Sequence, residues 1–149
     1  MTRPPFRADH VGSLLRPKAL VEAREAHRTG RLSAQALRSA EDTAIGEVIR
    51  RQEAIGLKSI TDGELRRQAW QTDFYNQIGG IVKGGEKVAV HFENDAGSTD
   101  FVVDTTRVGS KLHLDHTIFG EDFAFLKANT RQTAKLTIPS PSVLHRRGG

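Results

Sequence analysis

Three short segments place polar residues at the ends of apolar runs. They are residues 9–13, which end in Ser13, residues 60–64, which end in Glu64, and residues 136–142. In α/β folds, ligands bind at the carboxyl ends of the strands. We therefore expect the three segments to form part of one ligand-binding rim, with Glu64 as its carboxylate.

Each of these side chains also has a purely structural interpretation. Glu64 can cap the helix that follows it or pair with Arg67, and Ser13 can make local hydrogen bonds in its turn. His10 can face the binding site or be a hydrogen-bonded histidine near the core. The adjacent Arg66 and Arg67 are expected to form a solvated pair. The possible site residues beside Ser13 and Glu64 are His10, Asp62 and Ser140.

Other chemically suggestive residues favour structural roles. His113 and His116 belong to a segment expected to be extended, where they would point to opposite faces, so a metal pair is disfavoured. Residues 79–85 lack the Gly-Lys-Ser/Thr ending of a phosphate-binding loop and are interpreted as a flexible connector. Trp70 and Phe74 lie four residues apart on an expected helix, which predicts packing against the rest of the domain.

Composition narrows the class of protein. The chain has 149 residues, the size of one domain. Its net charge is +4, but the basic residues are scattered among acids, so no nucleic-acid partner is expected. No stretch is apolar enough to span a membrane, so no membrane partner is expected. It has no cysteine and hence no thiolate ligand or nucleophile. No apolar leader follows Met1. A soluble, cytoplasmic protein is the expectation.

Local signals predict alternating helices and strands. Pro17 suits the first turn of a helix that ends at Gly30. Ser33 is a good N-cap for a longer helix, which Gly56 would end. The remaining predicted elements are strands at 6–11, 57–61 and 134–138 and helices at 65–78 and 121–132. Strand, helix and strand in this order are typical of a parallel sheet.

Residues 84–116 differ from the rest of the chain because apolar and polar residues alternate on both sides of a turn-forming segment. We interpret this region as an antiparallel hairpin excursion inserted between parallel elements. The fold class is α/β, with three βα units of a partial (β/α)8 TIM barrel. A closed barrel needs about 250 residues, so the chain would hold less than half of one.

The order of these motifs resembles a known family. The matching segments are residues 6–17, residues 61–64 followed by Trp70, Asp73 and Phe74, and residues 136–142. They resemble the C-terminal, catalytic domain of cobalamin-independent methionine synthase and its stand-alone bacterial relatives. The likeness extends over nearly the whole chain, in order.

The resemblance implies a zinc-dependent TIM-barrel methyltransferase of methionine biosynthesis. Such enzymes transfer a methyl group from 5-methyltetrahydrofolate, as its polyglutamate, to homocysteine. Carried over to this sequence, the residues that bind homocysteine are Val11, Gly12, Ser13 and Glu64. A carboxylate suits the ammonium group of homocysteine, and a hydroxyl with a backbone N–H suits its carboxylate.

The sequence departs from the family in two respects. Where the long synthases have a tryptophan that stacks on the pterin, this chain has Pro141, in the Pro-Ser-Pro form of the stand-alone relatives. The family's zinc ligands and its proton-donating histidine have no counterparts here, so no catalytic and no metal-binding residue is expected. Residues 1–149 are expected to be the N-terminal portion of such a barrel, inactive alone, with a companion chain as a possible partner. The alternatives are another zinc-dependent thiol alkyltransferase, or a non-catalytic binding or assembly fragment.

Overall fold

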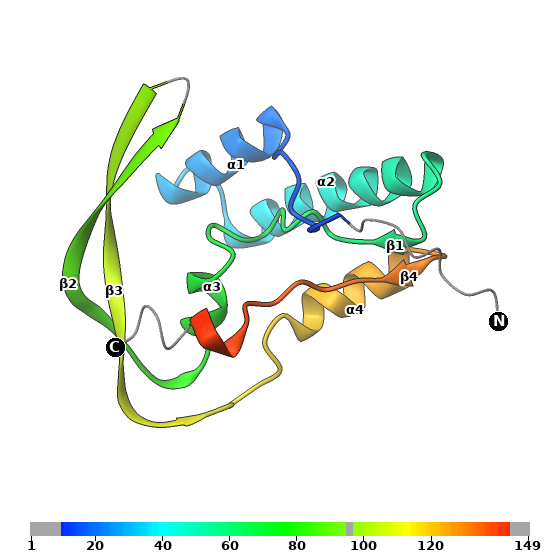
Figure 1. Ribbon diagram of the computed structural model, residues 1–149. Coiled ribbons are helices and arrows are strands. Elements are labelled where there is room, and N and C mark those ends of the chain that lie inside the picture. Colours follow the sequence, from blue (N-terminus) through cyan, green and yellow to red (C-terminus); the bar gives the residue numbers. More distant parts are fainter. Residues whose placement is uncertain (1–9, 95–96, 144–149) are drawn as a thin grey trace. The chain divides into compact units, whose positions relative to one another are not determined.

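The computed structural model describes residues 10–94 and 97–143, which divide into two compact units (Figure 1). The first unit contains the described residues 10–68 and 119–137. The second contains residues 69–94, 97–118 and 138–143. The segments that end in Ser13 and Glu64 both belong to the first unit.

Two helices, α1 (Lys18–Arg28) and α2 (Ala34–Ala54), form most of the first unit. Pro17 directly precedes α1, and the Ser33 hydroxyl caps α2 by accepting a hydrogen bond from the Ala36 amide at 3.2 Å. Gly56 follows α2 with a φ of 85°, a conformation that favours glycine. Both predicted helices are confirmed, because the signals that bound them are local.

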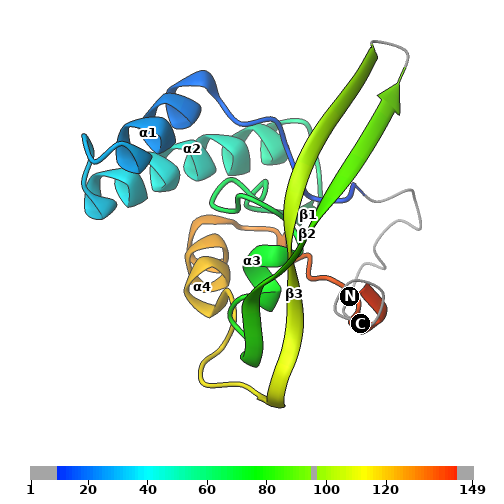
Figure 2. The same ribbon diagram turned by 90° about the vertical axis from the view of Figure 1, so that its left-hand side faces the viewer.

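A short parallel pair of strands packs with these helices. Ser59 and Ile60 of β1 (Ser59–Ile60) lie opposite the two residues of β4 (Thr133–Ala134), and α4 (Gly120–Asn129) precedes β4. Figures 1 and 2 show β1 and β4 side by side. The buried apolar core combines one residue of α1, three of α2, one each of β1 and α4, and one from the turn after β1: Leu20, Ala44, Ile45, Ile49, Ile60, Leu126 and Leu65.

The strands are shorter than the sequence predicted. Pairing within 57–61 is confined to Ser59–Ile60, and Thr133–Ala134 replaces most of the strand expected at 134–138. Residues 10–11 of the first predicted strand form no strand, and residues 6–9 lie outside the described residues. The mixed α/β class is confirmed. The described residues form no closed barrel, so the partial barrel and the boundaries 1–149 stay predictions.

The second unit begins with a short helix, α3 (Thr72–Tyr75). The helix predicted at 65–78 is therefore wrong over most of its length. Residues 63–66 form turns, because Gly63 and Glu64 both have positive φ and cannot begin an α-helix. Trp70 lies in a turn before α3, outside the helix, and is 50% exposed, so its predicted packing stays a prediction.

Strands β2 (Gly79–Asn94) and β3 (Gly97–His113) form an antiparallel hairpin. Its register places Gly79 opposite His113 and Asn94 opposite Gly97. Both views show a long, twisted ribbon (Figures 1 and 2). The predicted extended region was 84–116, whereas the strands occupy 79–113, so the segment interpreted as a flexible connector is part of β2. That the hairpin is an insertion into a barrel stays a prediction. None of the described helices combines the length and the apolar character needed to cross a membrane.

Candidate functional site

The turn that follows β1 carries the buried carboxylate of Glu64, four residues after the strand ends at Ile60. Gly63 and Glu64 have φ values of 69° and 54°. The Gly63 amide donates to the Thr61 hydroxyl at 3.2 Å, and the Glu64 amide donates to Asp62 Oδ1 at 2.9 Å. Left-handed backbone at a residue with a side chain costs about 1–3 kcal/mol. These hydrogen bonds help to offset that cost and to hold Glu64, which is 5% exposed, in place.

The turn at Gly12 and Ser13 lies against this strand end. The Thr61 hydroxyl donates to the Gly12 carbonyl at 2.8 Å, and the Leu14 amide donates to the Gly63 carbonyl at 3.0 Å. Gly12 has a φ of 116°, and a Cβ added to it would lie 3.0 Å from Thr61 Cγ2, so this approach requires glycine. Ser13 is exposed. Two of the three predicted segments therefore meet.

The beginning of the third segment joins them. The Thr137 hydroxyl donates to the Val11 carbonyl at 2.8 Å, and Lys135 Nζ donates to the His10 carbonyl. The Val11 side chain is 74% exposed. Within the first unit, residues 10–14, the end of β1 and the residues after β4 thus lie together, as the shared position at strand ends predicted.

Gln52 replaces a neighbouring strand at the end of β1. From α2, its amide Nε2 donates to the Thr61 carbonyl at 2.8 Å, and its Oε1 accepts from the Thr61 amide at 3.1 Å. The same oxygen lies 3.2 Å from His10 Nε2. Gln52 is 4% exposed and Thr61 2%, so the side chain satisfies two backbone groups that water cannot reach.

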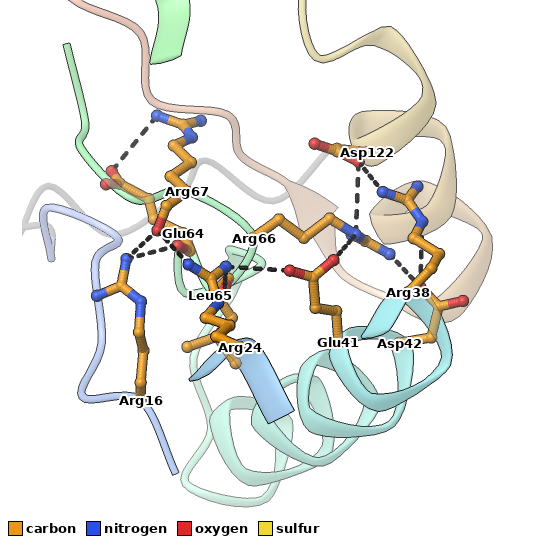
Figure 3. A network of polar contacts seen from close by, with 10 residues as sticks. All are labelled: Arg16, Arg24, Arg38, Glu41, Asp42, Glu64, Leu65, Arg66, Arg67 and Asp122. Atoms are coloured by element: carbon orange, nitrogen blue, oxygen red, sulfur yellow. Dashed lines mark hydrogen bonds and ion pairs between the residues drawn. The ribbon is translucent and has the colours of Figure 1, made fainter. Parts of the chain in front are cut away.

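Two arginines bind the backbone of the turn that carries Glu64 (Figure 3). Arg16 donates from Nη2 to the carbonyls of Glu64, at 3.2 Å, and Arg67. Arg24 donates from Nη1 to the Arg67 carbonyl at 3.1 Å, and from Nη2 to the Leu65 carbonyl. These two guanidinium groups thus bind three carbonyls of the turn and fix its path.

Arg66 points to α2 and α4 and lies among three carboxylates (Figure 3). Its guanidinium pairs with Asp42, lies 3.5 Å from Asp122 and 3.9 Å from Glu41, and stacks 4.8 Å from the Phe125 ring centre. Burial raises the pKa of Glu41, although the neighbouring guanidinium groups oppose the shift. The Arg66 side chain is 5% exposed. Its interactions with acids of α2 and α4 link the turn to these two helices.

Arg67 points to Glu64 instead. Its Nη1 lies 3.7 Å from Glu64 Oε1, an ion pair that is too long for a hydrogen bond. The guanidinium carbon lies 4.2 Å from the centre of the Phe119 ring. This ion pair is one of the two structural interpretations given above for Glu64. The predicted solvated pair of Arg66 and Arg67 is wrong, because both side chains are buried among carboxylates and aromatic rings.

The other singled-out residues lie in the second unit. Ser140 is exposed, and its hydroxyl meets that of Ser142 at 2.9 Å. His113 Nε2 lies 3.3 Å from Asp115 Oδ1, and His116 Nε2 lies 3.1 Å from Gln77 Oε1. Among the residues that the structure describes, no group of three or more His, Asp or Glu side chains could hold a metal ion.

The sequence reasoning missed the residues that position the turn: Arg16, Arg24, Glu41 and Gln52. A signal for the last two was present in the helical spacing. Glu41 and Gln52 fall on the same stripe of α2 as the apolar residues Ala44, Ile45 and Ile49, and all five are buried. Polar residues on a core-facing stripe need buried partners, and here those partners belong to the turn after β1 and to the arginines around it.

The sequence similarity to individual known proteins covers nearly the whole chain. No family model matches it. It is 39% identical to the uncharacterised protein YxjH of Bacillus subtilis (strain 168), over 94% of this chain and 36% of that protein. It is 37% identical to a methionine synthase of Sulfurisphaera tokodaii, over 88% of this chain and 37% of that protein.

A solved structure agrees with these sequence relatives. The fold matches the crystal structure of a candidate vitamin-B12 independent methionine synthase from Listeria monocytogenes with a TM-score of 0.75. The two sequences are 38% identical, and the match covers 97% of this chain and 39% of the other. The chain thus spans about two fifths of the length of the relatives it matches.

Proposed function

The chain belongs to the family of B12-independent methionine synthases, and from this premise we propose that it forms the part of a thiol methyltransferase site that binds the amino-acid end of the thiol substrate. One observation carries the proposal: Glu64 is buried at the end of β1, beside the Gly12-Ser13 turn. The homocysteine thiol would lie at the far end of the bound substrate, toward the methyl donor.

The roles follow from the chemistry of the groups. The Glu64 carboxylate would accept hydrogen bonds from the substrate ammonium group. The exposed Ser13 hydroxyl and the backbone of Val11, Gly12 and Ser13 would hold the substrate carboxylate. Both sets lie within the first unit, where hydrogen bonds between the two turns keep them adjacent. Such preorganisation lowers the entropic cost of binding.

The methyl donor and the metal belong to the complete enzyme. We propose 5-methyltetrahydrofolate as the donor, by analogy with the family. Zinc would supply a thiolate nucleophile when bound. The described residues do not fit a zinc site, since no cluster of three or more potential ligands occurs among them. We therefore assign zinc no step here, and we propose that a companion chain or segment completes the site and that the 149-residue chain alone is inactive.

A second candidate is another thiol alkyltransferase with the same amino-acid-binding turn. The observation in its favour is that YxjH, to which no reaction is assigned, is as similar to this chain as the named methionine synthase is. The two candidates share Glu64 and differ in the thiol that is bound. Competition between homocysteine and other aminothiols separates them.

Titration calorimetry with L-homocysteine tests the proposal. We expect the wild-type chain to bind it, and Glu64→Gln to weaken binding by about 10- to 100-fold, because a hydrogen bond to a charged group contributes about 1.5–3 kcal/mol. Glu25→Gln is the control, since Glu25 is an exposed carboxylate on α1. Equal binding by the Glu64 and Glu25 variants would contradict the proposal. Absence of any binding by the wild type would favour a non-catalytic assembly fragment.

A further inference from the structure

The ion pair between Glu64 and Arg67 is buried but incompletely satisfied. The Glu64 and Arg67 side chains are 6% and 4% exposed, and their closest charged atoms are 3.7 Å apart. Arg67 Nη2 is buried, and no described residue accepts a hydrogen bond from it. A buried donor without a partner costs about 1–3 kcal/mol, and more when it is charged. Arg24 Nε and the Nε and Nη1 atoms of Arg66 are also buried without an acceptor among the described residues, but both of those guanidinium groups donate a hydrogen bond to a carboxylate. The carboxylate beside Arg67 lies 3.7 Å away, so Arg67 makes no such bond.

An exposed pair elsewhere in the chain shows the difference. Glu25 and Arg28 have the same i,i+3 spacing on α1, and Arg28 donates to both carboxylate oxygens at 2.8 and 2.6 Å. Glu64 and Arg67 are held farther apart even though burial strengthens their attraction. The surrounding structure, and not the charges, therefore sets their separation.

The backbone of Arg67 is fixed from two directions. Its carbonyl accepts hydrogen bonds from both Arg16 and Arg24, and its guanidinium lies 4.2 Å from the Phe119 ring centre. Arg66, the preceding residue of the turn, lies among three carboxylates, whereas the carboxylate paired with Arg67 is that of Glu64. Arg67 is thus the arginine of this turn whose charge is least compensated (Figure 3).

From this arrangement we propose that Arg67 binds the carboxylate of an amino-acid ligand while Glu64 binds its ammonium group, an inference that rests on the function proposed above and deepens it. An α-amino acid bears both charges on one carbon atom, so it can enter between the two side chains. One long ion pair is then replaced by charge-assisted hydrogen bonds at both ends. Arg67 becomes a specificity residue for α-amino acids, alongside Ser13.

Analogues of homocysteine that lack one charged group test this assignment. The ligands are L-homocysteine, its decarboxylated analogue (an aminopropanethiol) and its deaminated analogue (a sulfanylbutanoic acid), each titrated into the full chain by calorimetry. We expect Arg67→Gln to weaken the binding of homocysteine and of the deaminated analogue by about 10- to 100-fold. The binding of the decarboxylated analogue should be unchanged. Glu64→Gln should show the opposite selectivity between the two analogues. Arg28→Gln, which alters the exposed pair, should change none of the three.

The outcomes separate this inference from the proposed function. Suppose that the wild type binds homocysteine and that Arg67→Gln weakens the binding of all three ligands equally, or of none. Arg67 is then structural and the inference is overturned, while the proposed function stands. If the wild type binds none of the ligands, both fall. Should Arg67→Gln fail to fold by circular dichroism, Arg67→Lys decides. It keeps the charge but loses the two-pronged geometry, so only the ligands that carry a carboxylate should weaken.

Discussion

Replacing Gln52 with leucine removes the side chain that holds the end of β1. Leucine has a similar size but cannot pair with the Thr61 amide and carbonyl, which Gln52 binds at 3.1 and 2.8 Å. Each buried backbone group left without a partner costs about 1–3 kcal/mol, or about 2–6 kcal/mol together. Burying a leucine side chain recovers roughly 1.5–3 kcal/mol. We expect a net loss of about 0.5–3 kcal/mol in the free energy of unfolding.

Urea unfolding followed by circular dichroism measures this loss. The matched control is Gln35→Leu, which makes the same substitution at an exposed position of the same helix and should change stability by less than about 0.5 kcal/mol. Because Thr61 immediately precedes the turn that carries Glu64, Gln52→Leu should also weaken homocysteine binding. If the two variants unfold at the same urea concentration with equal slopes, the role assigned to Gln52 is refuted.

Three further substitutions probe the elements around the site. Gly12→Ala should destabilise the fold and weaken homocysteine binding, because φ is 116° and the added Cβ would lie 3.0 Å from Thr61 Cγ2; calorimetry would contradict this if binding were unchanged. Ser33→Ala should lower the unfolding free energy by about 1 kcal/mol through loss of the α2 cap, and an unaltered urea midpoint would speak against that cap. Hydrogen bonds from Thr130 and Arg131 hold the pKa of Glu53 below its ordinary value of 4.5. The stability that these bonds contribute is therefore complete above pH 4.5 and is lost as the pH falls through the lower pKa of the folded state. Glu53→Gln should therefore be less stable than wild type at neutral pH and equal to it in strong acid, and a difference that persists in acid would exclude this explanation.

The features that the sequence predicted correctly depend on local interactions. Ser33 and Gly56 bound α2 through a cap and a left-handed residue, which need only a few neighbouring residues. The meeting of the segments near Gly12 and Glu64 was predicted from their shared position at strand ends. Hydrogen bonds within the first unit show that the two segments meet, although residues 10–11, which precede Gly12, form no strand.

The features that the sequence did not predict depend on distant residues. The turn at Gly63 and Glu64 replaces the expected helix because Arg16 and Arg24, more than 40 residues away in the chain, bind its carbonyls. Arg66 is buried because acids of α2 and α4 surround it. Local spacing contains no information on such pairings, so an arginine pair after a turn was interpreted as solvated.

The strand lengths differ for a related reason. Each strand was predicted from its run of apolar residues, but a strand forms only where a neighbouring strand pairs with its backbone. At Thr61 that neighbour is the side chain of Gln52, and at Val11 it is the hydroxyl of Thr137. Side chains thus satisfy backbone groups that a longer strand would have paired.

Mapping the position of bound L-methionine tests the central claim most directly, because methionine carries the same amino-acid end as homocysteine and is the product of the proposed reaction. In two-dimensional amide NMR spectra of the ¹⁵N-labelled chain, we predict that methionine shifts the resonances of Gly12, Ser13, Gly63 and Glu64, and that Glu64→Gln abolishes these shifts. The amides of the β2–β3 hairpin should stay in place. Shifts confined to the hairpin, or unchanged shifts in the Glu64 variant, would contradict an amino-acid-binding site at the end of β1.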